Sequence, residues 1–372
     1  MKKKIRMGII GCGSVSVNHI RGTMESPDME VGAICDSVPG NLEEKAECFG
    51  IPKEVCFSDY IAMIDSGKID AVSICSPNHL HYQMTLDVIQ RGLPYALEKP
   101  VCNSEAEAKA LLEETDKKGI PNMVCFSYRF KAAARYARYL IQSGQLGTIY
   151  HINVEYLQGW GLPDAVNGKP IPLNWHFTKE KCGTGVLGDL GCHMIDMCRF
   201  LTGREFTRVS ADLDTFIHER PLPDSDVKGV VDIDDYVNII GQLGPFAEMR
   251  SGEGSPPVSP VAVNLAITRF AYSRDNYQRV EVYGEKGAIR YSLDGEDRLE
   301  VNMGNWPMRR GRVWCNVPIP GEYNSEQMQS FADIVNGCGD GLAAGIRDGW
   351  KAQLIVDSAL ASSESGMRKN II

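Results

Sequence analysis

Residues 7–16 have the sequence MGIIGCGSVS, a short β-branched run that stops at Gly11 and continues with the spacing G-x-G-x-x-S. A glycine at position 11 permits a tight turn after a strand, and Gly13 allows a ligand to approach the backbone closely. The N–H groups that follow, from Ser14 and Val15 onward, belong to a helix start, where the helix dipole favours an anion. The stretch therefore predicts a strand, an anion-binding turn and a helix, with Ser16 small enough to fit beneath the strand.

Strands and helices alternate from this turn as far as residue 127. Strands alternating with helical segments of about 10–15 residues indicate a doubly wound parallel sheet with right-handed crossovers. We therefore expect an α/β Rossmann domain over residues 1–128. The expected strands are 5–11, 31–35, 55–57, 71–75, 94–97 and 122–127, and the expected helices are 14–26, 41–49, 59–66, 79–91 and 104–118.

The pattern changes after Arg129, where strand-like segments follow one another. Such a run of strands indicates an α+β domain with a large, mostly antiparallel open sheet, which we place at residues 129–372. Loops rich in Pro and Gly at 219–228 and 251–260 are expected to be exposed. A helix is expected at 131–143, strands at 148–157, 207–216, 235–243, 261–272, 278–283 and 287–292, and two helices within 326–365.

Composition argues against several classes of function. The 372 residues carry a net charge of −9 without a stripe of Lys and Arg, so we expect no nucleic-acid partner. No stretch approaches the roughly 20 apolar residues of a membrane span, and the apolar run after Lys2 to Lys4 is too short for a secretory leader. The twelve cysteines are scattered without a CxxC pair. We therefore expect reduced, packed thiols in a cytoplasmic protein.

Asp36 follows the second expected strand, about 20 residues beyond the glycine turn. A carboxylate in this position accepts hydrogen bonds from the ribose hydroxyls of a dinucleotide and repels a 2′-phosphate. We therefore expect NAD as the cofactor, with NADP less favoured. The alternative is an ordinary turn followed by a surface aspartate.

Three further residues suit the oxidation of an alcohol, in which a base takes the hydroxyl proton while a hydride leaves carbon. Asp189 and His193 are four residues apart, so on a helix the carboxylate can orient the imidazole and support its positive charge. Lys99 follows an expected parallel strand, at the edge where open α/β sheets bind ligands, and could stabilise a developing alkoxide. Considered alone, these residues could also be a surface pair and a solvated lysine.

Two motifs, together with the glycine turn, resemble the Gfo/Idh/MocA family of oxidoreductases. The first is Ser76-Pro77-Asn78-His79-Leu80-His81 followed by Glu98-Lys99-Pro100, and the second is CGTGVLGDLGCHMID at residues 182–196. The resemblance implies His193 as general base, Lys99 as the group that polarises the reacting oxygen, and Asp189 as a partner that also touches the substrate. It implies hydride exchange between a nicotinamide and a ring hydroxyl or ketone of a sugar, glycoside or inositol-type polyol.

Other candidates have plausible structural roles as well. Ser76, Asn78, His81 and Glu98 are expected near the cofactor, although Asn78 could instead cap a helix. Arg129, Trp175 and His176 are expected near the substrate; Arg129 could instead form an ion pair, and the tryptophan could pack in the core. Asp189, His193 and His176 have zinc-type side chains, but no compact ligand motif supports a metal, and we expect none.

Three hypotheses of function remain open. The first is a dehydrogenase or reductase, the second a redox-neutral enzyme that cleaves a glycoside through transient oxidation at C3, and the third a non-catalytic dinucleotide-binding protein. A large sheet with one uncovered face exposes apolar surface. We therefore also expect a homodimer or homotetramer formed through the C-terminal sheet.

Overall fold

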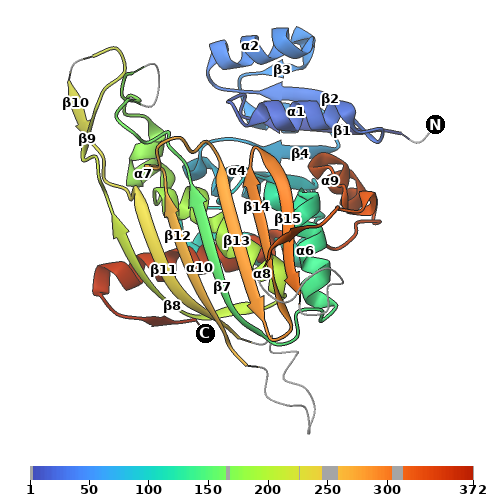
Figure 1. Cartoon of the computed structure of the whole chain (residues 1–372). Coiled ribbons are helices and arrows are strands. Elements are labelled where there is room, and N and C mark those ends of the chain that lie inside the picture. Colours follow the sequence, from blue (N-terminus) through green and yellow to red (C-terminus); the bar gives the residue numbers. More distant parts are fainter. Residues whose placement is uncertain (1–2, 165–167, 226, 245–258, 304–312, 372) are drawn as a thin grey trace. The chain divides into compact units, whose positions relative to one another are not determined.

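The computed structural model describes residues 3–164, 168–225, 227–244, 259–303 and 313–371. Contacts divide the chain into two compact units, which are described separately (Figure 1). The first unit comprises Met1–Phe130 and Ser325–Gln353, and the second comprises Lys131–Asn324 and Leu354–Ile372.

The segment 325–353, which the sequence analysis assigned to the second domain, belongs to the first unit. The reason is packing: helix α9 (Gln327–Val335) lies against helix α1 (Ser16–Glu25) and strand β6 (Asn122–Val124). Gln329 accepts a hydrogen bond from the Ser26 hydroxyl at 2.6 Å and donates one to Asp28 at 3.0 Å. A late part of the chain thus completes the first core.

The sheet of the first unit is six-stranded and parallel, in the order β3-β2-β1-β4-β5-β6. The strand order reverses between β1 and β4, and ligands bind at such a switch point in open α/β sheets. The predicted doubly wound fold is confirmed. The strands are β1 (Ile5–Ile10), β2 (Met29–Cys35), β3 (Cys56–Phe57), β4 (Ala71–Ile74) and β5 (Tyr95–Leu97), with β6 as above, and the helices that follow α1 are α2 (Pro39–Phe49), α3 (Tyr60–Ile64), α4 (Asn78–Gln90) and α5 (Glu105–Lys118).

Helix α5 illustrates how the local sequence sets the boundaries of an element. The Ser104 hydroxyl accepts a hydrogen bond from the Glu107 N–H at 3.3 Å, which caps the start of the helix. Lys117 and Lys118 lie in the last turn, where positive charge suits the helix dipole. Gly119 ends the helix in the left-handed conformation, with φ of 62°.

The second unit is built on a nine-stranded sheet in the order β16-β15-β14-β13-β7-β12-β11-β8-β17. Only the β7–β12 pair is parallel among the pairings of the described strands. The prediction of a large, mostly antiparallel sheet is therefore confirmed. The strands are β7 (Ile149–Leu157), β8 (Glu205–Asp214), β11 (Tyr236–Gly244), β12 (Val261–Thr268), β13 (Tyr277–Gly284), β14 (Gly287–Asp294), β15 (Glu296–Met303), β16 (Cys315–Asn316) and β17 (Lys369–Asn370).

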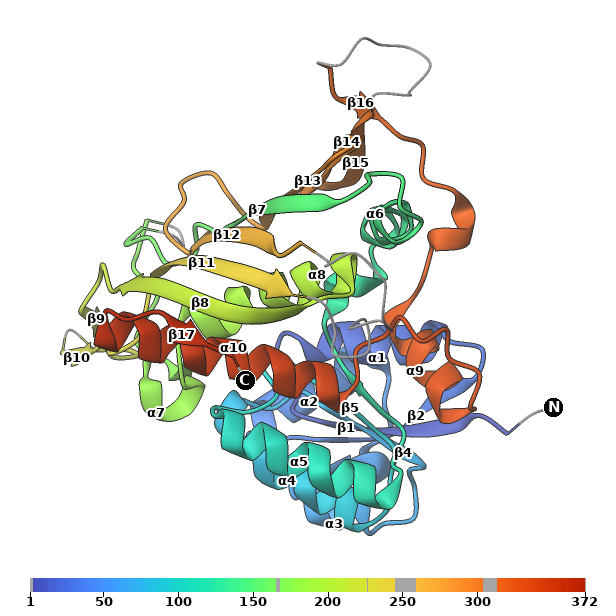
Figure 2. The same cartoon turned by 90° about the horizontal axis from the view of Figure 1, so that it is seen from below.

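One face of this sheet carries helices α6 (Ala132–Gln142) and α8 (Cys192–Thr202), as Figures 1 and 2 show. The other face has no helix over it in the described ranges of the second unit. Burial alternates along the central strands accordingly: Val237 and Ile239 are fully buried, whereas Ile240 is 62% exposed. The C-terminal part of α10 (Ile346–Ser365) follows β8, the neighbour of the edge strand β17, and Ser362 there accepts a hydrogen bond from the Ala211 N–H at 3.1 Å.

Two expectations for this unit require correction. Residues 219–228 are not simply an exposed loop, because they contribute to the hairpin of β9 (Glu219–Pro221) and β10 (Lys228–Val230), with Arg220 only 1% exposed. Strand β15, whose sequence is largely charged and polar, was not predicted. Most of the expected loop at 251–260 lies outside the described residues. No helix in the described part of the chain is long and apolar enough to span a membrane.

Candidate active site

The predicted glycine turn lies between β1 and α1, against the end of β4. Gly11 has φ of 89°, and a Cβ added there would lie 2.7 Å from the carbonyl carbon and oxygen of Cys75. A Cβ added at Gly13, by contrast, would meet no atom of the chain within 4 Å. Helix α1 begins without a side-chain cap. The turn therefore combines open space at Gly13 with an uncapped helix end, as a bound diphosphate requires.

Asp36 directly follows β2 and is tied to this turn. Its carboxylate accepts hydrogen bonds from the Cys12 N–H at 2.7 Å and from the Val38 N–H at 2.8 Å. These bonds hold the carboxylate beside the glycine turn, in the position in which an acidic residue meets a dinucleotide ribose. The residues present thus fit an NAD molecule.

Ser76, the residue after Cys75 at the end of β4, gives independent support. The residue is buried, and its hydroxyl has no hydrogen-bond partner among the described residues. A buried hydroxyl without a partner is unfavourable unless a ligand or water satisfies it. Ser76 also adjoins Gly11, because a Cβ at Gly11 would lie 2.9 Å from the Ser76 nitrogen.

His81 faces the protein backbone. It is 1% exposed, and its ring nitrogens lie 2.8 Å from the Pro100 oxygen and 2.8 Å from the Ser76 oxygen. The ring therefore connects the end of β4 with the segment after Lys99, and it supports the predicted cofactor site rather than facing a ligand. Asn78 is the first residue of α4 and is also buried.

Glu98 and Lys99 follow β5 at the carboxyl edge of the sheet, as predicted. Glu98 is buried and forms an ion pair with His19, with 2.8 Å between Oε1 and Nε2, and it accepts the Lys99 N–H at 3.2 Å. Arg129, predicted to contact substrate or to form an ion pair, is paired with Asp348 at 3.2 Å and donates to the Leu342 oxygen at 3.3 Å.

The second motif forms a π-helical turn, η4 (Leu187–Gly191), that leads into α8. Asp189 lies in this turn and is half-buried, and its N–H donates to the Gly185 oxygen at 3.0 Å. His193 lies in the first turn of α8, is 6% exposed, and has its ring centroid 6.4 Å from that of Tyr156. The helical run that carries both residues is irregular, because Asp189 lies in the π-helical turn and His193 in the α-helix that continues directly from it.

A distant aspartate holds this turn. Asp234 accepts hydrogen bonds from the Gly185 N–H at 2.6 Å and from the Leu187 N–H at 2.7 Å. Burial raises the pKa of Asp234, although both backbone bonds favour its charged form. A Cβ at Gly185 would lie only 1.9 Å from the Asp234 carbonyl oxygen. Gly185 is thus the residue that permits this close packing, and the packing fixes the backbone that carries Asp189.

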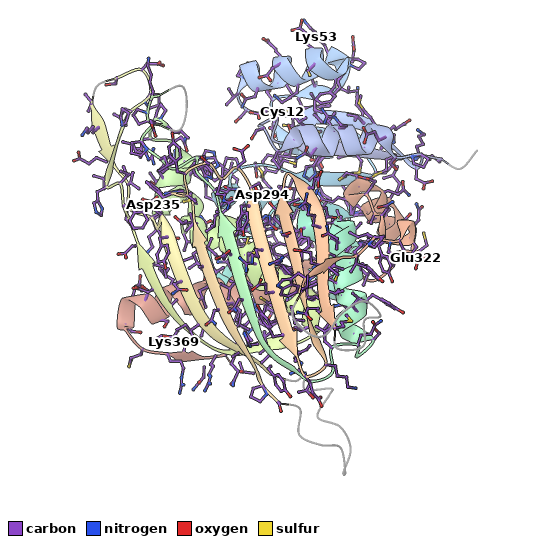
Figure 3. The ribbon with its side chains drawn as sticks, in the orientation of Figure 1. Cys12, Lys53, Asp235, Asp294, Glu322 and Lys369 are labelled. Carbon is purple, nitrogen blue, oxygen red and sulfur yellow. The ribbon has the colours of Figure 1, made fainter. Side chains whose placement is uncertain are left out.

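Trp175 and His176 lie in the short helix η3 (Trp175–Phe177), and their rings stack at 3.6 Å between centroids. Two buried arginines support this loop. Arg269 donates a hydrogen bond to the carboxylate of Asp235 at 2.7 Å and another to the backbone oxygen of His176 at 3.4 Å. Asp235, labelled in Figure 3, lies just before β11. Arg220 lies over the Phe177 ring and donates to the oxygens of Gly161 and Ile171.

Among the described residues, one group of side chains has the types and spacing to hold a metal ion: His19, Glu98 and Cys125. It does not include Asp189, His193 or His176. Among the described residues, Lys99 belongs to the first unit, and Asp189 and His193 belong to the second.

Comparison with known proteins agrees with these features. The family model described as "Oxidoreductase family, NAD-binding Rossmann fold" matches residues 5–126, and the "GFO/IDH/MocA C-terminal domain" matches residues 134–290. Levoglucosan dehydrogenase of Pseudarthrobacter phenanthrenivorans is 33% identical over 320 residues, which cover 80% of this chain and 76% of that protein. The chain belongs to the Gfo/Idh/MocA family.

Other members of the Gfo/Idh/MocA family match along nearly the whole chain. Inositol 2-dehydrogenase of Rhizobium meliloti is 25% identical over 358 residues and covers 96% of both chains. The solved structure of levoglucosan dehydrogenase in complex with NADH is 29% identical, with a TM-score of 0.84 and full coverage of both chains. The chain is thus an oxidoreductase with an NAD-binding Rossmann domain, as the sequence predicted.

Three residues that shape the site were missed by the sequence analysis: His19, Asp234 and Arg220. His19 follows the glycine turn within α1, so its position beside the motif was an available signal. Asp234 belongs to the acidic run Asp232-Ile233-Asp234-Asp235 before a strand. Arg220 had no signal, because its partners lie 49 and 59 residues away.

Proposed function

We propose that this chain is an NAD-dependent dehydrogenase that oxidises a ring hydroxyl of a sugar, glycoside or inositol-type polyol to a ketone, and catalyses the reverse reduction. The observation that carries the proposal is the glycine turn beside Asp36 and the buried Ser76 hydroxyl, with Lys99 at the carboxyl edge of the same sheet. A dinucleotide site and a cationic side chain thus share one edge of one sheet.

The proton is handled by side chains of this chain. NAD, which Gly11, Gly13 and Asp36 would hold, would supply the acceptor for the hydride of the carbinol carbon. His193 takes the hydroxyl proton as general base. Lys99 stabilises the negative charge that develops on the oxygen. Asp189 orients His193 and contacts the substrate. The products are the ketone, NADH and one proton.

The names of the relatives suggest which substrates to try first. Levoglucosan is the leading candidate because the dehydrogenase of that name is 33% identical to this chain. D-Apiose, D-glucosides and myo-inositol follow, since enzymes named for each of these substrates are also related. Trp175 and His176, which stack on one another, are proposed to contact the apolar face of the ring.

The test is NADH formation at 340 nm with NAD or NADP against these compounds, preceded by analysis of any copurified nucleotide. Sugar-dependent NADH formation supports the proposal. Absence of NADH with every compound, in a protein that retains bound NAD and cleaves a glycoside, would replace it with the redox-neutral reaction. Absence of both activities in a protein that binds NADH would indicate a non-catalytic dinucleotide-binding protein.

We also propose a cytoplasmic homodimer or homotetramer. All twelve cysteines are free thiols in the structure, which suits a reducing compartment. The uncovered face of the nine-stranded sheet displays Ile240, which is 62% exposed. Analytical ultracentrifugation at micromolar concentration tests the assembly: only a 41.1 kDa species would contradict it.

A further inference from the structure

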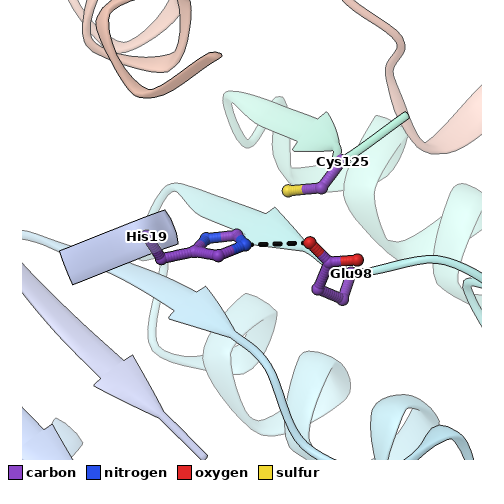
Figure 4. Close-up of side chains that lie close together, drawn as sticks. All are labelled: His19, Glu98 and Cys125. Atoms are coloured by element: carbon purple, nitrogen blue, oxygen red, sulfur yellow. Dashed lines mark hydrogen bonds and ion pairs between the residues drawn. The ribbon is translucent and has the colours of Figure 1, made fainter. Parts of the chain in front are cut away.

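A buried ion pair joins helix α1 to the segment that carries Lys99. Nε2 of His19 lies 2.8 Å from Oε1 of Glu98, and the two residues are 1% and 8% exposed. Figure 4 shows the imidazole reaching across from α1 to the carboxylate at the end of β5. Because α1 starts at the glycine turn, the pair connects the dinucleotide-binding turn with Lys99.

Each end of this pair is held by a second bond. The other ring nitrogen of His19, Nδ1, lies 2.6 Å from the Ser73 hydroxyl on β4, which fixes the plane of the ring. The other carboxylate oxygen, Oε2 of Glu98, accepts the Lys99 N–H at 3.2 Å. Beyond Lys99, the Pro100 oxygen is bonded to buried His81 at 2.8 Å. The backbone at Lys99 is therefore braced on both sides.

We propose that His19 is a positioning residue for hydride transfer: through Glu98 it sets the backbone of Lys99 relative to the helix that binds the cofactor. The inference rests on the proposed function. His19 acts through Glu98 and through no contact with substrate. A shift of about 1 Å at a reacting group can cost about 100-fold in rate, so the loss of this brace should reduce kcat.

The charges around His19 favour an ionised pair at neutral pH. Burial alone would lower the pKa of His19, but the sulfur of Cys75 and the carboxylate of Glu98 raise it to about 10. Burial alone would raise the pKa of Glu98, but His19 and Lys99 lower it. Cys125, on the segment after β6, is the remaining titratable group of the cluster, and burial raises the pKa of its thiol so that it stays neutral.

The same three side chains could be considered as a metal site, since their ligand atoms lie within 4.8 Å of one another. The contacts instead favour a hydrogen-bonded proton between His19 and Glu98. His19 Nε2 and Glu98 Oε1 are in direct hydrogen-bond contact at 2.8 Å, and Nδ1 is engaged by Ser73 at 2.6 Å. A zinc thiolate would also require an ionised Cys125, which its burial opposes.

The test compares His19→Gln and Glu98→Gln with the wild-type full-length protein, and uses His218→Gln, an exposed histidine of the second unit, as the matched control. We expect kcat to fall by about tenfold or more in both variants, with NADH dissociation constants within about threefold of wild type. The pH profile of kcat should also shift, because the surroundings of Lys99 change. A kcat within twofold of wild type and an unchanged pH profile would overturn the proposal, even if the melting temperature falls.

Hydrogen exchange of peptides covering Lys99 provides a readout that does not depend on turnover. Both variants should accelerate hydrogen exchange at the Lys99 amide. Unchanged exchange would contradict the proposal that His19 and Glu98 hold the backbone at Lys99. If the wild-type protein forms no NADH with any sugar, the proposed function fails, and the exchange experiment still decides whether His19 controls Lys99. Ser73→Ala, which removes only the second bond of the ring, should show a smaller effect of the same kind and serves if the charge variants do not fold. One equivalent of zinc in the purified protein, lost in His19→Gln, would replace the brace with a metal site.

Discussion

The chain contains two glycine-rich turns that each lead into a helix, and they use glycine for different reasons. At Gly13 an added Cβ would meet no atom of the protein within 4 Å, whereas at Gly185 it would lie 1.9 Å from the Asp234 oxygen. The space beside Gly13 is open, so the absence of a side chain there leaves room for a ligand. The second turn is filled by the protein itself, so that glycine there matters for packing, and the packing fixes Asp189.

The largest expected effect is on the rate of the proposed reaction. Lys99→Ala or His193→Ala should reduce kcat by about 10²–10⁴-fold, because each removes a group that we propose handles the proton or the developing charge. NADH binding, measured by fluorescence titration, should change little. Unchanged kcat in either variant would remove that residue from the mechanism.

Alanine at the two glycines should give opposite signatures. Gly185→Ala should destabilise the protein by about 3 kcal/mol, because the methyl group collides with backbone. Gly13→Ala should leave stability within about 0.5 kcal/mol and weaken NADH binding by about tenfold. Urea unfolding and NADH titration of both variants check this. Equal effects of the two variants on stability would contradict the distinction between the turns.

Asp36→Asn should change cofactor preference. The amide keeps an acceptor for the Cys12 N–H but removes the charge that repels a 2′-phosphate, so the preference for NAD over NADP should fall by about tenfold. The ratio of kcat/KM values for the two cofactors measures it. An unchanged ratio would show that Asp36 serves only to hold the turn.

The smallest effect concerns pH and the His19–Glu98 pair. The folded-state pKa of His19 is raised from the ordinary 6.5 to about 10, so its contribution to stability is complete below about pH 6.5 and is lost as pH rises through about 10. The pKa of Glu98 is lowered, so the contribution of Glu98 to stability is complete above the ordinary carboxylate pKa and is lost only as the pH falls below it. The difference in melting temperature between wild type and His19→Gln should therefore shrink from pH 6 to pH 10. A difference that grows with pH would contradict the assignment.

Much of the fold was predictable because strands, helices and turns leave patterns among neighbouring residues. The first sheet was predicted from apolar strands that alternate with helices, and the glycine turn from the spacing of its glycines. Hydrogen bonds between segments far apart in the sequence leave no such pattern, so they could not be predicted. Asp234 holds Gly185 from 49 residues away, and Arg220 reaches Gly161 across 59 residues. Strand β15 was not predicted because its many charged and polar residues obscure the alternation of apolar and polar positions that is typical of a strand.

Deuterium transfer tests the central claim most directly. Levoglucosan deuterated at its ring carbons would be incubated with the protein and NAD, and the nicotinamide analysed by mass spectrometry and NMR. We predict one deuterium at C4 of the NADH formed and a ketone in equal amount. NADH without deuterium, or no reduced nucleotide with any deuterated sugar of the panel, would contradict direct hydride transfer from a sugar carbon.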